Sequence, residues 1–134
     1  MKKLALCILL SMITCFGFAQ TRRYYCEVKG IEKSFGNGLK IIFDFGERTS
    51  YTIWGDLSRK LKFVDENGEV IDFHSMVDAA NYMVEKGWTF QQAHSSVYGG
   101  SYLECWIFYK DATSQQEAKK GIMTKDDYEK MKKQ

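Results

Sequence analysis

The 134-residue chain has no proline and only two histidines, and its charges nearly cancel. Its 19 Lys and Arg face 17 Asp and Glu, giving a formal net charge of +2, so the chain has no electrostatic field that would favour nucleic acid as a partner. The length excludes a two-domain dinucleotide enzyme and a barrel of roughly 250 residues. These absences favour one small domain.

Long hydrophobic runs are missing except at the start of the chain. Lys2 and Lys3 precede an uncharged apolar stretch, Leu4 to Phe18, and Gly17 and Ala19 are small residues at positions −3 and −1 before Gln20. This pattern predicts a secretory signal peptide at residues 1–19. About fifteen apolar residues are fewer than the ~20 needed to span a bilayer.

We therefore expect an exported protein, located in the periplasm or outside the cell, with no membrane span after cleavage. Lipidation at Cys15 is the weaker alternative, because Met12-Ile13-Thr14 does not supply the small residues expected before a lipidated cysteine.

Cleavage would leave only two of the four cysteines, Cys26 and Cys105, in an oxidising setting. Cys26 is in phase with Val28, and Cys105 is in phase with Leu103, so we expect both side chains to point at one apolar layer. Two interpretations stay open. The pair could form a disulfide that closes a loop of about eighty residues, or it could be two buried free thiols that behave as small hydrophobic residues.

The hydrophobic pattern predicts an α+β fold. Strands are predicted at 22–30, from 39 and at 51–54, with a hairpin across 61–73 around Asn67-Gly68 and a last hairpin across 88–110. A helix is predicted at 75–87, with an apolar stripe of Met76, Val77, Ala80, Met83 and Val84. We expect a small twisted antiparallel sheet of about five to seven strands with one helix packed on a face.

The composition changes at Ala112 and divides the mature chain. Residues 20–111 are predicted to form the single α+β domain, and 112–134 a linker and a short C-terminal helix capped by Thr124. The sequence does not decide whether this helical tail docks on the domain.

The last predicted strand is apolar on both faces, with Leu103, Cys105, Ile107 and Tyr109 on one and Tyr102, Trp106 and Phe108 on the other. One helix covers one face of a small sheet, so the second must be covered by curling of the sheet, the tail, a second copy or a ligand. The candidate binding residues are the aromatics Trp54, Tyr98, Tyr102 and Trp106. Trp88 follows the helix stop and is expected in the core.

Residue patterns for catalysis or metal binding are lacking. His74 and His94 have neither helical i, i+4 spacing nor a nearby pair of cysteines. There is no nucleophile elbow, phosphate loop or dinucleotide fingerprint. We therefore expect no catalytic residues, no metal site and no cofactor.

Two segments resemble known bacterial domains. Residues 121–133, GIMTKDDYEKMKK, resemble the second half of the bacterial short C-terminal domain, a helical appendage, which implies self-association or partner contacts. Residues 61–110, with a helix ending in Lys86-Gly87-Trp88, resemble small exported uncharacterised domains of gut bacteria. That second resemblance implies the β-α-β arrangement and export, without an established activity.

The sequence favours a non-enzymatic binding module that associates with itself or with another envelope protein through an aromatic sheet face. One alternative is a small periplasmic enzyme or carbohydrate-contacting accessory domain that uses His94, Tyr98 and Glu104. Another is a structural envelope protein. The sequence gives no membrane or nucleic-acid partner and does not identify a small-molecule ligand.

Overall fold

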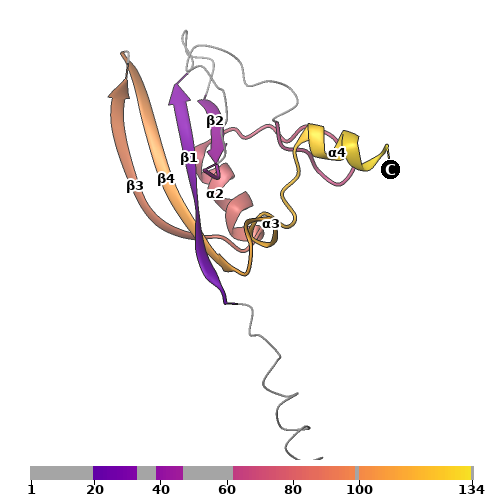
Figure 1. Ribbon diagram of the computed structural model, residues 1–134. Helices are drawn as coiled ribbons and strands as arrows, with labels where there is room; N and C mark the ends of the chain where they lie inside the picture. The colour runs from indigo at the N-terminus through magenta and orange to yellow at the C-terminus, as the bar shows by residue number, and fades with distance from the viewer. Residues whose placement is uncertain (1–19, 33–38, 47–61, 99, 134) are drawn as a thin grey trace, which may run out of the picture.

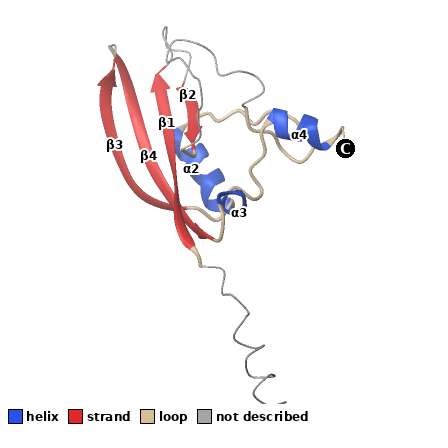
Figure 2. Ribbon diagram, viewed as in Figure 1, coloured by secondary structure: helices blue, strands red, loops and turns tan. Residues whose placement is uncertain are grey.

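The computed structural model describes residues 20–32, 39–46, 62–98 and 100–133. Its elements are β1 (Arg22–Glu32), β2 (Leu39–Asp44), α2 (Met76–Glu85), β3 (Thr89–Tyr98), β4 (Ser101–Ala112), α3 (Gln115–Ala118) and α4 (Lys125–Met131). The strands form one antiparallel sheet in the order β2-β1-β4-β3, with the helices on one side of it (Figures 1 and 2).

The α+β class is confirmed, but the sheet of the described residues has four strands, fewer than expected. The strand predicted at 51–54 lies outside the described residues. The strands predicted at 22–30 and from 39 are present as the antiparallel pair β1 and β2, and the predicted last hairpin as β3 and β4. Between them, the first strand pairs with the last, so β1 and β4 form the centre of the sheet.

Of the hairpin predicted at 61–73, the described residues 62–73 form a tight turn with a single internal bridge, Val64 to Val70. The Asp65 carboxylate accepts hydrogen bonds from the backbone N–H groups of Asn67 and Glu69, each at 2.9 Å. On its other edge the same segment pairs with the C-terminal tail, where Phe63 bridges to Thr124 and the Val64 N–H donates to the Met123 carbonyl at 3.0 Å. The Gly68 N–H donates to the Asp65 carbonyl at 3.0 Å, so Glu66 and Asn67 are the central residues of the turn. The presence of a turn here was therefore predicted, whereas its two central residues and the extended strands were not.

Helix α2 begins and ends where local capping predicts. The side chain of Ser75 accepts a hydrogen bond from the Asp78 N–H at 3.1 Å, and Gly87 takes a positive φ of 80° after the helix. Its buried residues are Met76, Ala79 and Met83. The predicted stripe was too wide, since Val77 and Val84 are 59% and 58% exposed.

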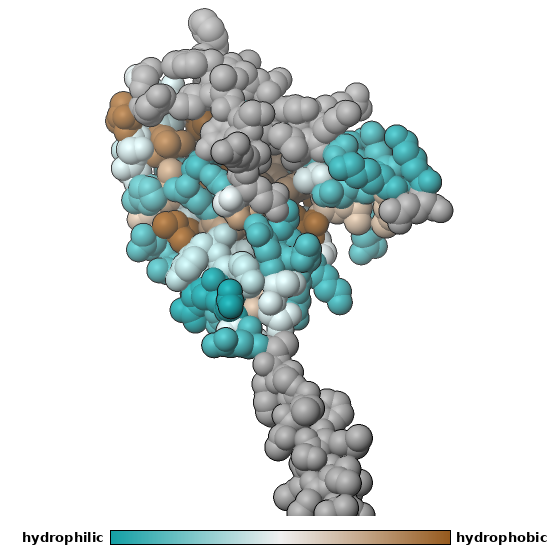
Figure 3. All heavy atoms as spheres, viewed as in Figure 1, coloured by the Kyte–Doolittle hydropathy of each residue, from teal (hydrophilic) through white to brown (hydrophobic). Residues whose placement is uncertain are grey.

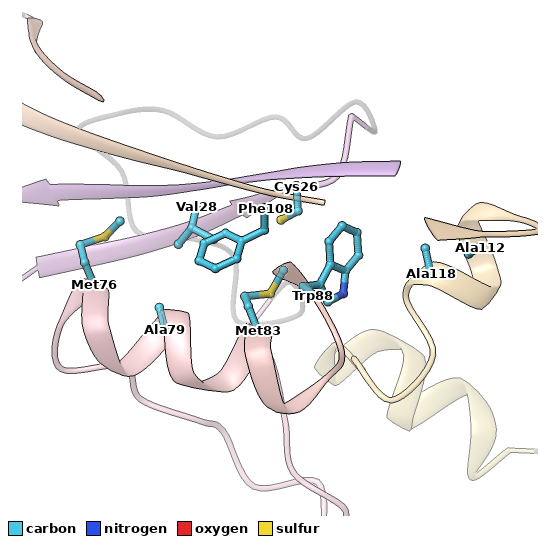
Figure 4. Packing of buried hydrophobic residues seen from close by; sticks show 9 residues of the cluster. All are labelled: Cys26, Val28, Met76, Ala79, Met83, Trp88, Phe108, Ala112 and Ala118. Atoms are coloured by element: carbon cyan, nitrogen blue, oxygen red, sulfur yellow. The ribbon is translucent and has the colours of Figure 1, made fainter. Parts of the chain in front are cut away.

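The core lies between α2 and the sheet (Figure 4). Trp88 is 2% exposed and lies between the end of α2 and the sheet, as expected for a residue that follows a helix stop. The cluster of buried residues comprises Cys26, Val28, Met76, Ala79, Met83, Trp88, Phe108, Ala112 and Ala118.

The C-terminal tail packs on the same side of the sheet as α2 (Figure 1). Ala118 of α3 is fully buried in the core cluster, and the Gln115 side chain donates a hydrogen bond to the Phe45 carbonyl at 3.0 Å. In α4, Thr124 and Asp127 form a capping box. The tail therefore contributes to the core and is not what covers the other face of the sheet.

Among the described helices, none has the length and apolar character needed to cross a membrane.

Candidate functional site

The strand register assigns each side chain of the sheet to one of two faces. Val28 is opposite both Phe43 and Trp106, and Val28 belongs to the core under α2. Side chains directly opposite each other share a face, and neighbours along a strand alternate. The helix-side face therefore carries Val28 and Trp106, and the second face carries Lys29 and Cys105, which are also opposite each other.

The predicted aromatic residues do not form one platform within the described part of the chain. Trp54 lies outside the described residues. Tyr98 ends β3 opposite Ser101, and only its backbone is described. Tyr102 is 54% exposed, whereas Trp106 is half-buried and packs against the core cluster.

Tyr102 and Trp106 share the helix-side face of the β3–β4 hairpin with two exposed residues that the sequence did not single out. Phe90 is 46% exposed and lies edge-on to Trp106, with ring centroids 5.6 Å apart. Val97 is 68% exposed and directly opposite Tyr102. We call Phe90, Val97, Tyr102 and Trp106 the hairpin strip. Figure 3 shows hydrophobic surface over this hairpin.

Strand β3 is an edge of the sheet, because only β4 pairs with it among the described strands. Its sequence, TFQQAHSSVY, contains no Lys, Arg, Asp, Glu or Pro. Natural edge strands are usually protected against pairing with another chain by charged residues, proline or bulges. One irregularity, between Phe90 and Gln92, interrupts the register near the start of β3. The remainder of the strand is a regular edge without charged protection.

Cys26 and Cys105 are free and buried. Cys26 is opposite Phe108 on the helix-side face, and Cys105 is opposite Lys29 on the second face. The expectation that both cysteine side chains point at the same apolar layer is therefore wrong. Strand β4 is apolar on both faces, so the alternation of its residues does not show which face meets the core. No disulfide joins them in the structure. Burial raises the pKa of both thiols.

The second face carries a small charged network centred on Lys29, whose side chain is 15% exposed. Its ammonium lies 3.0 Å from Oε2 of Glu27 and 2.9 Å from Oδ2 of Asp44. Burial opposes ionisation of Asp44, but hydrogen bonds from Lys29 and from the Gly46 N–H outweigh it and lower the Asp44 pKa. The network ties β1 to β2.

The Glu27 carboxylate also lies near two further residues, His94 and Cys105. Its Oε1 lies 3.9 Å from Nε2 of His94, and the thiol of Cys105 hydrogen-bonds to its carboxylate. One ligand atom from each of Glu27, His94 and Cys105 lies within 4.8 Å of the other two. Strands β1, β3 and β4 thus bring a carboxylate, an imidazole and a thiol together.

Sequence analysis missed this cluster, although a signal for it was present. The last hairpin was predicted, and in an antiparallel pair that starts with Tyr98 opposite Ser101 the register places His94 opposite Cys105. Glu27 could not be found this way, because its partnership with β4 is long-range.

The alternative set of His94, Tyr98 and Glu104 is not assembled by the fold. His94 is opposite Cys105, whereas Glu104 is opposite Ser95. His94 and Glu104 therefore project from opposite faces of the sheet. The two side chains cannot act on one substrate without a rearrangement of the hairpin.

Comparison with protein-family models, with curated proteins and with solved structures finds no match.

Proposed function

We propose that this chain is an exported, non-enzymatic interaction module that associates with a second copy of itself through the β3–β4 hairpin. The observation that carries the proposal is the edge strand β3, which is ten residues long, contains no Lys, Arg, Asp or Glu, and is bordered by exposed apolar side chains. Such an edge is a template for a further strand.

A second copy is a suitable partner, because a two-fold axis perpendicular to the sheet pairs two β3 strands antiparallel. This operation keeps both helix-side faces on the same side of the enlarged sheet. The exposed Phe90 and Val97 of each copy would then lie next to those of the other. Pairing would satisfy the free backbone groups of the edge and cover part of the hairpin strip.

The test is the molar mass in solution of residues 20–134, a chain that retains every described residue. We expect a dimer by light scattering coupled to size exclusion. Val97→Lys places a charge on the exposed end of β3, where pairing of the two strands along their length would bring it next to the apolar Phe90 of the other copy. The dissociation constant should rise at least about tenfold, which corresponds to about 1.4 kcal/mol.

The matched control is Val77→Lys, because Val77 is a similarly exposed valine on helix α2, away from the edge strand. This variant should remain dimeric. A wild-type chain that stays monomeric at every concentration contradicts the proposal, and so does a Val97→Lys variant that associates as tightly as the wild type.

A further inference from the structure

We infer that the second face of the sheet carries a site for a borderline divalent transition metal ion, Zn²⁺, bound by Glu27, His94 and Cys105. The inference stands on the placement of three different ligand types and does not depend on self-association. Carboxylate oxygen, imidazole nitrogen and thiolate sulfur are the three side-chain donors that zinc accepts.

The distances fit a tetrahedral ion after a small adjustment. Zinc bonds of about 2.0–2.2 Å to nitrogen and oxygen and about 2.3 Å to sulfur place neighbouring ligand atoms roughly 3.3–3.6 Å apart. The Nε2 of His94 and the Oε1 of Glu27 are already 3.9 Å apart, and the cluster as a whole lies within 4.8 Å. A side-chain movement of about half an ångström would bring the His94 nitrogen and the Glu27 oxygen from 3.9 Å into this range. The backbone positions of His94 and Cys105 are fixed by their strand pairing.

The two oxygens of Glu27 have separate partners, which supports a ligand role for one of them. Oε2 is held by Lys29 at 3.0 Å, and Oε1 is directed toward His94. Lys29 is in turn held by Asp44 at 2.9 Å. Partners of this kind orient a ligating carboxylate before the metal arrives.

The charges of the neighbourhood also suit a dication. The carboxylates of Glu27 and Asp44 and a Cys105 thiolate carry three negative charges, and Lys29 carries one positive charge. A Zn²⁺ ion therefore neutralises the group, in agreement with the requirement that buried charges be compensated.

The site has an entry path and an open fourth position. Cys105 is 3% exposed, but the side chains of His94 and Glu27 are 50% and 32% exposed, so an ion can reach the thiol from the solvent side. Three protein ligands leave one tetrahedral position for water or an exchangeable ligand, the arrangement of zinc sites that interact with other molecules.

The experiment is calorimetric titration of Zn²⁺ into reduced residues 20–134, with Co²⁺ absorption as a second readout. We expect one ion per chain, and a thiolate-to-cobalt charge-transfer band. Cys105→Ala should abolish that band, and both Cys105→Ala and His94→Ala should weaken Zn²⁺ binding at least about a hundredfold.

Matched controls come from the residues of the same type elsewhere in the chain. Cys26→Ala and His74→Ala should retain Zn²⁺ binding, because Cys26 lies on the helix-side face and His74 precedes α2. Circular dichroism establishes that each variant is folded. His94 is half-exposed, so His94→Ala tests the site even if Cys105→Ala does not fold.

The inference is overturned if the wild-type chain binds no Zn²⁺ at micromolar concentrations, or if His94→Ala binds it as tightly as the wild type. A thiolate-to-cobalt band that is retained in Cys105→Ala and lost in Cys26→Ala would also overturn the inference. The Val97→Lys variant should bind Zn²⁺ normally, which separates this result from the test of self-association.

Discussion

Gly68 occupies a backbone conformation and a space that only glycine fits. Its φ is +82°, in the left-handed region, and a Cβ built there would lie 2.2 Å from Cε1 of Tyr128. The Tyr128 hydroxyl donates a hydrogen bond to the Asn67 carbonyl at 2.9 Å, so the ring cannot move away without losing that bond. The turn and the tail helix α4 therefore meet at this glycine.

We predict that Gly68→Ala lowers the free energy of unfolding by about 3 kcal/mol, through left-handed strain of roughly 1–2 kcal/mol and overpacking against the ring. The measurement is urea unfolding followed by circular dichroism. Gly46→Ala is the control for strain alone, because Gly46 has a φ of +80° with no described atom within 4 Å of the built Cβ. Equal decreases in the free energy of unfolding of the two variants would contradict the predicted steric clash with Tyr128.

Helix α3 is short, but it attaches the tail to the core through Ala118. This side chain is fully buried in the cluster that includes Trp88 and Met83, whereas Gln116 on the same helix is exposed. A charge at position 118 would be placed among apolar atoms without a partner.

We predict that Ala118→Glu lowers the free energy of unfolding by at least about 3 kcal/mol, because a buried charge without a partner is strongly unfavourable. Gln116→Glu should change it by less than about 0.5 kcal/mol. Thermal unfolding of the two variants checks this. Truncation after residue 111 should likewise destabilise the domain, so a tail that can be removed without loss of stability would contradict its role in the core.

Local signals at the ends of elements predicted α2, α4 and the last hairpin. Ser75, Gly87 and Thr124 act within a few residues of their own positions, and so their effect can be found in the sequence. The partnership of β1 with β4 joins Arg23 to Asp111, 88 positions apart, and no local pattern contains it. For that reason the strand order, the face of Cys105 and the approach of Glu27 to His94 were not predictable.

In the candidate site too, the locally determined residues were predicted and those that depend on long-range packing were not. Tyr102 and Trp106 were recognised because alternation along one strand is a local property. Phe90 and Val97 were missed, since their exposure depends on how far α2 extends over the sheet. Trp54 remains a prediction outside the described residues.

At the scale of the whole molecule, acidic groups with lowered pKa values set the pH dependence of stability. Hydrogen bonds from Arg23 lower the pKa of Asp111, and hydrogen bonds from Thr113 lower that of Glu117. The backbone N–H of Glu69 does the same for Asp65, and the pKa of Asp44 is lowered as described above. Each group binds its proton more weakly in the folded chain than in the unfolded chain.

Stability from these groups is therefore present above their unfolded pKa values of about 4 and is lost as the pH falls through the folded values. We predict a melting temperature that is nearly constant from about pH 7 to 5 and falls below about pH 4. Asp44→Asn should flatten part of this decline, because it removes one of the groups with a lowered pKa. Melting curves across this pH range check the prediction, and a chain that gains stability on acidification would contradict it.

The central position of β1 has a consequence for the order in which the chain can fold during synthesis. Translation proceeds from the N-terminus, so β1 is made first, yet β4, its partner in the middle of the sheet, follows some eighty residues later. Until β4 emerges, β2 is the one described strand that can pair with β1, and a two-stranded hairpin is marginally stable in water. Ala118 comes later still, and without it the core is incomplete. The four-stranded sheet therefore cannot form before β4 has been made, and the core is complete only once α3 follows it.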